Sequence, residues 1–324
     1  MPPLYPEDVR ALLIVNPQAT STTQVRRNAI TRALASELDL EVVQTRYRGH
    51  GRHVAAGAAR AGYEVVLTLG GDGTVNEAVN GLLAGRPAAG LPLFAPLPGG
   101  NANVFTRAIG LAADPVDATG EVLAALRRGS TRPVGLGLAG DRYFCINAGL
   151  GLDAEVVRVV EGWRARGRPA TPALYLRAIA RQFFFVTDRR APALTMERPG
   201  KPGMTGLFCG IVSNTRPWTY LGRRPVTPSP RASFGTGLDL FALRRLAVVG
   251  TLAAGRQMLR ANGRPPRGKH IATLHDEALF AFRASRPVAF QLDGEYVGER
   301  ECVTFHAIPD ALRVVCARRA ADGT

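Results

Sequence analysis

A glycine-rich turn that carries one carboxylate is the stretch of this sequence best suited to chemistry. It reads Gly70-Gly71-Asp72-Gly73-Thr74 and follows an apolar run at residues 65–69, which predicts a buried strand. From Thr74 onward the apolar residues recur with a helical period. A strand, a glycine turn and a helix start place several N–H groups and a positive dipole end at one point. The turn therefore predicts an anion site suited to phosphate.

The same residues also have a purely structural interpretation. Thr74 and Glu77 fit a capping box, in which two side chains satisfy N–H groups at the start of one helix. Capping of that kind does not explain Asp72. A carboxylate beside a phosphate is repulsive unless Mg²⁺, a ribose hydroxyl or a transferable proton lies there. We therefore expect Asp72 to take part in catalysis or metal binding.

A second glycine turn, Pro98-Gly99-Gly100-Asn101-Ala102-Asn103, follows a strand predicted at residues 91–97. Strand and helix patterns alternate up to about residue 128, with strands at 11–15 and 40–45 and helices at 22–38 and 52–61. This alternation predicts a parallel, doubly wound sheet. Because both glycine turns follow strands, we expect them to line one crevice at the carboxyl edge of that sheet.

The composition changes near residues 129–133, and short β-type runs separated by Gly and Pro follow. They lie at residues 133–138, 142–147, 193–196, 207–213, 238–242, 278–282, 288–292 and 303–306. Such spacing predicts an antiparallel β-sandwich or barrel. We expect an α/β domain at residues 1–131 and a β-sandwich domain at 132–311. A last run at 312–317 could return to the first domain.

Two carboxylates stand together in the late segment Gln291-Leu292-Asp293-Gly294-Glu295. Asp-Gly is also an ordinary hairpin turn, so the segment by itself is a weak signal. A hydroxyl group that attacks phosphorus needs a carboxylate within hydrogen-bond reach to accept its proton.

These motifs, in this order, resemble those of the diacylglycerol kinase and sphingosine kinase family of lipid kinases. NAD kinases share Gly-Gly-Asp-Gly-Thr, but the continuation Val75-Asn76-Glu77-Ala78-Val79-Asn80-Gly81 is similar to the lipid-kinase pattern. The resemblance implies that ATP and Mg²⁺ bind at the two glycine turns and that the lipid enters between the domains. The nucleotide contacts it implies are Asn16, Pro17, Thr45, Gly70, Gly71, Gly73, Thr74, Glu77, Gly99, Gly100, Asn101 and Asn103, with Asp72 as a metal ligand.

The resemblance also implies roles for residues of the β domain. In this family the Asp-Gly-Glu turn supplies the general base for the lipid hydroxyl. Glu295 is therefore the first candidate base, with Asp293 as its partner and Asp72 as the competing candidate. A further family motif ends at Asp153 and Glu155. One of these two is expected to orient the substrate headgroup, unless it occupies a salt-bridged surface position.

The chain departs from the family pattern in two places. Asn101 replaces a threonine and Val104 replaces an aspartate, so a Mg²⁺–water contact from position 104 is lost. The loop that holds a structural Mg²⁺ in bacterial members keeps only Asp239. We therefore do not expect that structural ion here.

The function that these motifs imply is an ATP-dependent lipid kinase. It would transfer the γ-phosphoryl group to a hydroxyl of a membrane-derived lipid, either diacylglycerol or a sphingoid or ceramide-like alcohol. One alternative is an NAD kinase, which needs the same glycine motif but a soluble dinucleotide. A second alternative is a lipid-binding regulator on an inactive kinase fold, suggested by the altered Asn101 and Val104 positions.

Composition bears on partners and location. The 324 residues carry a formal charge of +15, almost wholly from arginine, which suggests anionic partners. The four cysteines are widely spaced, which supports neither a zinc site nor a disulfide framework. No signal peptide and no apolar run of about 18 residues is evident. We expect a cytoplasmic, peripherally membrane-associated protein whose partners are a lipid substrate and anionic phospholipids, not nucleic acid; a homodimer is left open.

Two predicted helices carry flanking arginines. Residues 172–186 place Leu176, Ile179 and Phe183 on one face, and residues 246–259 run into a basic segment that ends at 270. Each helix could simply pack on the sheet. The alternative for the first is an amphipathic segment that faces a membrane.

Overall fold

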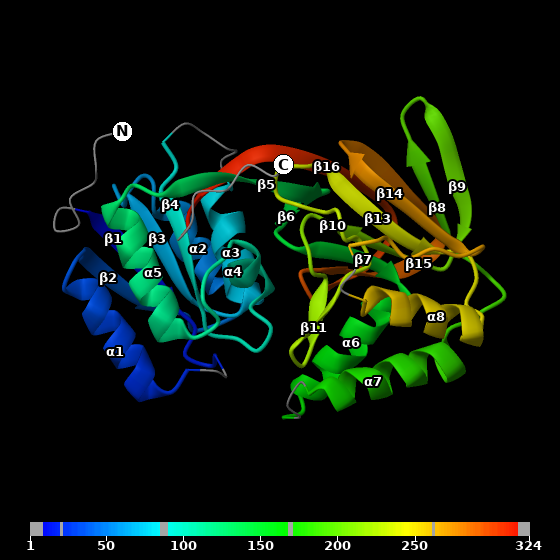
Figure 1. Ribbon diagram of the computed structural model, residues 1–324, viewed down its shortest axis with the longest axis horizontal. Coiled ribbons are helices and arrows are strands. Elements are labelled where there is room, and N and C mark those ends of the chain that lie inside the picture. Colours follow the sequence, from blue (N-terminus) through cyan, green and yellow to red (C-terminus); the bar gives the residue numbers. More distant parts are fainter. Residues whose placement is uncertain (1–8, 20–21, 85–89, 168–170, 261–262, 317–324) are drawn as a thin grey trace. The chain divides into compact units, whose positions relative to one another are not determined.

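The computed structural model describes residues 9–19, 22–84, 90–167, 171–260 and 263–316 (Figure 1). Contacts divide the chain into two compact units, Met1–Val134 with Asp310–Thr324, and Gly135–Pro309. The division falls inside β5 (Thr131–Ala139), the strand that contains the boundary expected near residue 131. Each unit is described separately below.

The first unit contains a parallel sheet, which confirms the predicted doubly wound α/β architecture. Its strands are ordered β16-β4-β3-β1-β2, and every neighbouring pair is parallel. α1 packs beside α5, while α2 and α4 both contact α3. The elements are β1 (Arg10–Val15), α1 (Gln24–Ala35), β2 (Asp39–Gln44), α2 (His50–Gly57), β3 (Val65–Gly70), α3 (Asp72–Leu82), β4 (Leu93–Pro98), α4 (Val104–Ala108) and α5 (Pro115–Arg127).

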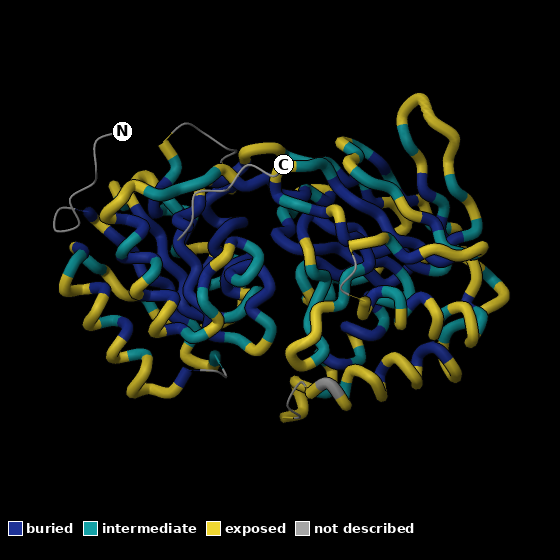
Figure 2. Tube along the Cα trace, viewed as in Figure 1, coloured by how far each residue is buried: buried dark blue, intermediate teal, exposed yellow. Residues whose placement is uncertain are grey.

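Burial explains which sequence runs became central strands. All six residues of β3 are buried, as are five of the six in β1, which is typical of parallel strands covered on both faces (Figure 2). β2 lies at the end of the strand order and keeps an exposed, partly charged sequence. The last residues of the long strand β16 (Glu295–Val315) belong to this unit, where Val314 pairs in parallel with Phe94 of β4.

The second unit is an antiparallel β domain, as the sequence predicted. Its strand order is β14-β13-β10-β7-β15-β16; β8 pairs with β15 and β9 with β8, while β5 pairs with β16 and β6 with β5. The strands are β6 (Arg142–Phe144), β7 (Asn147–Gly151), β8 (Leu194–Arg198), β9 (Lys201–Leu207), β10 (Cys209–Ser213), β11 (Thr219–Leu221), β12 (Arg224–Val226), β13 (Leu238–Leu243), β14 (Ile271–Glu277) and β15 (Leu279–Leu292). Buried phenylalanines form much of its core, including Phe144, Phe280, Phe282, Phe290 and Phe305.

Two strand predictions need correction. The runs at 278–282 and 288–292 form one strand, β15, because its first half pairs with β8, its second half with β7, and β16 pairs along both halves. The run at 142–147 is instead split into β6 and β7. The amides of Cys145 and Ile146, at the break, donate to the side chain of Asp293.

Helices cover one face of the second unit's sheet. Alternate residues of β10 and β13 face two different clusters: Val212 and Leu240 join the phenylalanine core, while Ile211 and Phe241 pack with Phe183. The helices are α6 (Leu152–Arg164), α7 (Pro172–Arg181), the π-helix η2 (Gln182–Val186) and α8 (Val248–Met258).

The single helix predicted at 172–186 is therefore two elements, and its apolar face was assigned wrongly. Ala178 and Phe183 are buried, whereas Leu176 and Ile179 are 55% and 42% exposed. Within the described ranges, no helix has both the length and the apolar character that crossing a membrane requires.

Candidate active site

The carboxyl edge of the first unit's sheet gathers residues that the sequence singled out separately. The amide of Thr45 donates to the carbonyl of Val15 at 2.8 Å, and that of Asn16 donates to the carbonyl of Leu69 at 3.0 Å. The strand order β2-β1-β3-β4 therefore lines up Thr45, Asn16 and the two glycine turns along one edge. Ligands of open α/β sheets bind at this edge.

The two glycine turns pack backbone against backbone. The Gly99 amide donates to the Gly70 carbonyl at 2.8 Å. A Cβ added to Gly99 would lie 2.9 Å from the Gly70 Cα, and one added to Gly100 would lie 2.6 Å from the Gly71 Cα. Glycine is thus required at the second turn because no side chain fits between the turns.

Gly73 differs from these tightly packed glycines. A Cβ added there would meet no atom within 4 Å, so the space beside it is open. Gly71, which has no side chain, occupies the N-cap position of α3 in extended backbone geometry. The helix start therefore presents backbone next to open space, an arrangement that fits a phosphate group.

Asp72 caps a neighbouring helix. Its Oδ2 accepts a hydrogen bond from the Val104 amide at 3.1 Å, and its Oδ1 accepts one from the Phe105 amide at 3.0 Å. These two amides begin α4, so the carboxylate satisfies the start of the helix that follows the second glycine turn. Capping therefore does explain Asp72, contrary to the expectation from the sequence, because the helix it caps is α4 and not the helix that contains it.

Glu77 has a similar role toward another helix. Its carboxylate accepts hydrogen bonds from the Gly49 amide at 2.7 Å and the Gly51 amide at 3.0 Å, at the start of α2. The hydroxyl of Thr74 accepts a 3.4 Å hydrogen bond from Nδ2 of Asn16. The capping box expected between Thr74 and Glu77 is replaced by these longer-range contacts, which join the first glycine turn to α2 and β1.

Asn103 shapes the second turn from within. Its Oδ1 accepts from the Gly100 amide at 2.8 Å, and its Nδ2 donates to the Gly100 carbonyl at 2.6 Å. Its φ of +46° lies in the left-handed region, which asparagine tolerates better than most residues. Asn101 and Pro17 are exposed. The side chain of Asn103 therefore fixes the turn, while Asn101 and Pro17 are accessible to a ligand.

The donor set at this edge fits a nucleotide better than a protein-held metal. In the described part of the chain, no three His, Cys, Asp or Glu residues are grouped to hold an ion. Mg²⁺ commonly binds through substrate phosphates, water and one or two carboxylates. The described residues therefore do not form a metal centre of their own.

In the second unit, Asp293 is anchored by three backbone amides. Oδ2 accepts from Cys145 at 2.8 Å, and Oδ1 accepts from Ile146 at 2.8 Å and from Asn147 at 3.0 Å. The backbone of Asp293 is left-handed at φ +48° and its amide donates to the Asn147 carbonyl at 2.8 Å. Asp293 therefore ties the β15–β16 turn to the start of β7.

Glu295 has a different environment. Its carboxylate forms an ion pair with the guanidinium of Arg142, and the two side chains keep 20% and 29% of their surface exposed. A carboxylate that stays partly exposed can be approached by a substrate. Arg142 was not identified from the sequence, where nothing distinguishes it from the many other arginines.

A buried glutamine connects this turn to Asp153. Nε2 of Gln291 donates to Oδ2 of Asp153 at 2.8 Å and to Oδ1 of Asn147 at 2.9 Å, and its Oε1 accepts from the Gly294 amide at 2.9 Å. Gln291 is 1% exposed and was missed. Its sequence signal was a polar residue inside an otherwise apolar strand directly before the turn.

Asp153 has a raised pKa. Burial of its carboxylate raises the pKa to about 6, and the hydrogen bond from Gln291 lowers the pKa by a smaller amount. Part of the residue's surface stays accessible. Gly149 must be glycine, because a Cβ there would overlap the Asp153 carboxylate. Glu155 instead pairs with Arg158 and accepts from Gln182 at 3.3 Å, which is the salt-bridged alternative.

Comparison with known proteins gives a consistent result. Residues 10–139 match the model of the diacylglycerol kinase catalytic domain. The chain is 26% identical to "Diacylglycerol kinase" of Bacillus subtilis over 89% of this chain and 90% of that protein. It is 36% identical to "Probable lipid kinase YegS-like" of Chromohalobacter salexigens, over 44% of each. A solved diacylglycerol kinase structure from Bacillus anthracis superposes with a TM-score of 0.67 at 18% identity, covering 95% of this chain and 96% of that one, which shows the shared fold.

Proposed function

The chain belongs to the family of lipid kinases that carry the diacylglycerol kinase catalytic domain, and from this membership we propose that it transfers the γ-phosphoryl group of ATP to a hydroxyl of a membrane-derived lipid. The observation that carries the proposal is the pair of interlocked glycine turns beside the start of α3. Phosphoryl transfer depends mainly on positioning and on electrostatic stabilisation, which such a backbone cradle supplies.

The nucleotide phosphates would lie against Gly71, Gly73 and the second turn. The open space beside Gly73 provides room, and the dipole of α3 favours negative charge there. Asp72 contributes by holding α4 and thereby the second turn in place. In this role Asp72 positions the cradle, and its carboxylate need not touch the phosphates.

The proposed general base, which accepts the proton of the lipid hydroxyl, is Glu295. Asp293 already accepts three backbone hydrogen bonds, so most of its acceptor capacity is used within the fold. Glu295 is held by the side chain of Arg142 and remains partly exposed. Arg142 orients the carboxylate, and Asp293 fixes the turn that carries it.

Diacylglycerol is the first substrate to test, because the Bacillus subtilis relative that aligns along most of the chain is named a diacylglycerol kinase. Sphingoid bases and ceramide are the other alcohols of the same class. A kinase acting on a soluble dinucleotide is not favoured by any relative reported above.

The decisive experiment incubates the purified protein with γ-labelled ATP and Mg²⁺ against diacylglycerol, sphingosine, ceramide and NAD in parallel. We expect label in phosphatidic acid, formed roughly 10²–10⁴-fold more slowly with Glu295→Gln at matched protein concentration. Label in NADP would replace the proposal with an NAD kinase. Nucleotide binding without any labelled product would instead support a lipid-binding regulator.

A further inference from the structure

An exposed apolar ridge runs over three helical elements of the second unit. It consists of Leu176 and Ile179 of α7, Phe184, Phe185 and Val186 of η2, and Val248, Val249 and Leu252 of α8. Phe185, Val249 and Leu252 are 85%, 81% and 69% exposed. Figure 2 shows exposed residues along α7 and α8. Scattered apolar residues are normal on a surface, but a contiguous patch of large ones marks an interaction site.

The three successive phenylalanines of the π-helix η2 are divided between the core and the surface. Phe183 and Gln182 are buried, at 5% and 1% exposure, and Phe183 packs in the cluster that includes Leu246 and Met258. The next two residues, Phe184 and Phe185, leave that cluster. π-helical turns occur frequently at functional sites. The exposure of Phe184 and Phe185 is thus built into a folded helical element.

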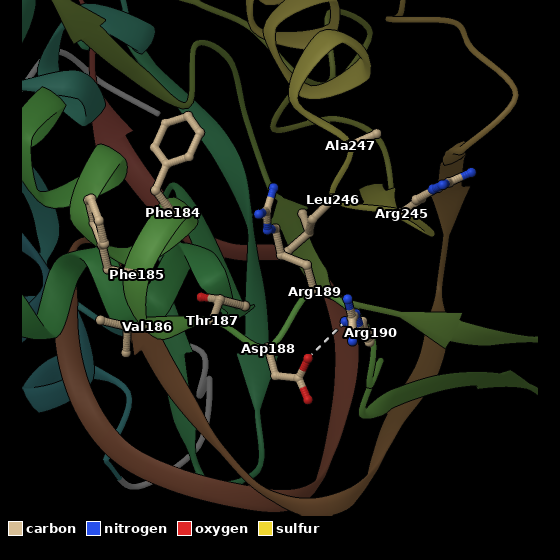
Figure 3. Close-up of a pocket in the computed structure, with 10 residues that line it drawn as sticks. All are labelled: Phe184, Phe185, Val186, Thr187, Asp188, Arg189, Arg190, Arg245, Leu246 and Ala247. Atoms are coloured by element: carbon tan, nitrogen blue, oxygen red, sulfur yellow. Dashed lines mark hydrogen bonds between the residues drawn. The ribbon is translucent and has the colours of Figure 1, made fainter.

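Arginines border the ridge. Residues 184–190 and 245–247 line a groove of about 540 Å³, to which Arg189, Arg190 and Arg245 contribute (Figure 3). All three residues are exposed, and none of their guanidinium groups has an ion pair with a described residue. The groove's acidic lining residue, Asp188, accepts from the backbone amide of Arg190 at 2.9 Å. The border is therefore positively charged.

We propose that this apolar ridge docks the protein on the surface of a membrane that contains anionic phospholipid. Apolar side chains next to arginines match the boundary between acyl chains and anionic headgroups. A second copy of the chain fits less well, because a two-fold interface brings the same surface together and would place these arginines opposite one another. This inference rests on the proposed function in one respect: the docking surface is where the enzyme would meet its lipid substrate.

Vesicle co-sedimentation without ATP tests the proposal. One vesicle type is pure phosphatidylcholine and the other also contains phosphatidylglycerol. Phe184→Ser/Phe185→Ser should lower partitioning into the mixed vesicles by about tenfold or more, given the apolar area lost. Arg189→Gln/Arg190→Gln/Arg245→Gln should lower it about 100-fold at low salt, and this effect should shrink as salt rises.

Matched controls lie in the first unit. Val25→Ser removes a side chain that is 78% exposed on α1, and Arg32→Gln/Arg60→Gln/Arg128→Gln removes three exposed arginines. Both should bind vesicles like the unaltered protein. Equal losses in the ridge and control variants would overturn the proposal, as would wild-type binding by the ridge variants. A ridge variant that only converts a dimer to a monomer, with vesicle binding unchanged, would assign the ridge to self-association and also overturn it.

Activity on a water-soluble, short-chain diacylglycerol separates this inference from the proposed function. The ridge variants should phosphorylate the monomeric lipid at the wild-type rate and lose activity only on vesicles. Vesicle binding that depends on the ridge, in a protein that phosphorylates no lipid, would refute the kinase proposal and leave the docking surface intact. Loss of activity on the monomeric lipid together with an unchanged thermal transition would show that the ridge belongs to the substrate site instead.

Discussion

Asp293→Asn should destabilise the second unit, because the carboxylate of Asp293 is a structural anchor. It accepts from the amides of Cys145, Ile146 and Asn147, which belong to residues that are 1%, 2% and 5% exposed. Asparagine tolerates the left-handed backbone of this position as aspartate does, so the difference in stability between variant and wild type does not arise from backbone strain. Its amide oxygen can replace Oδ1, but its NH₂ group would then face the amide of Cys145.

The expected cost combines two effects. One hydrogen bond to a charged acceptor is lost and leaves a buried donor unsatisfied, and the remaining two lose their charge assistance. Together these should lower the free energy of unfolding by about 2–4 kcal/mol. Urea unfolding of the variant and of Asp141→Asn provides the measurement. Asp141 is an exposed carboxylate on the turn between β5 and β6, and its replacement should change stability by less than about 0.5 kcal/mol.

The outcome also tests the assignment of the general base. A variant that unfolds like the wild type but has lost turnover would show that Asp293 acts on the substrate. The structural anchor and the preference for Glu295 would both then be refuted. Reduced stability with residual turnover in the folded fraction is the result we expect.

Three further predictions concern other positions. Glu295→Gln should lower kcat by roughly 10²–10⁴-fold with little change in KM for ATP, because it removes a base and keeps its shape; an unaltered kcat would exclude Glu295. Gly73→Ala should fold normally, since the added methyl meets nothing within 4 Å, but it should weaken ATP binding measured by calorimetry. Gly99→Ala, whose methyl would lie 2.9 Å from the Gly70 backbone, should lose both ATP binding and stability. Asp153 has a pKa raised from 3.8 to about 6, so the folded state binds more protons than the unfolded state between these pH values. The free energy of unfolding should therefore fall as pH rises from about 4 to 6. Asp153→Asn should flatten that slope, and an unchanged slope would show that another group causes it.

The strongest sequence predictions concerned segments whose local pattern and final structure agree. The buried strand, glycine turn and helix at residues 65–83 were recognised because strand burial, glycine spacing and helical period are all properties of neighbouring residues. The alternation of strands and helices likewise sufficed for the parallel sheet. Helix and strand ends were less accurate: the helix expected at 52–61 begins at His50 and ends at Gly57.

The error at residues 172–186 has a different origin. The apolar residues there have the spacing of an ordinary amphipathic helix, so periodicity predicts that Leu176, Ile179 and Phe183 share one face, whether that face packs on the sheet or meets a membrane. In the fold, α7 ends at Arg181 and the π-helix η2 follows, and Phe183 of η2 packs in the core. Leu176, Ile179, Phe184 and Phe185 remain outside.

By itself, the sequence determined the order of the elements, the parallel α/β first domain, the β-rich second domain and the glycine turns that suit phosphate. Only the tertiary structure decided what each carboxylate does. Glu77 accepts a hydrogen bond from an amide 28 residues earlier, Asp72 from one 32 residues later, and Asp293 from one 148 residues away. An acidic side chain looks the same in the sequence whether it accepts hydrogen bonds from backbone amides within the fold or takes a proton from a substrate. The difference depends on which donors the folded chain brings within hydrogen-bond distance, and those donors lie outside any local pattern.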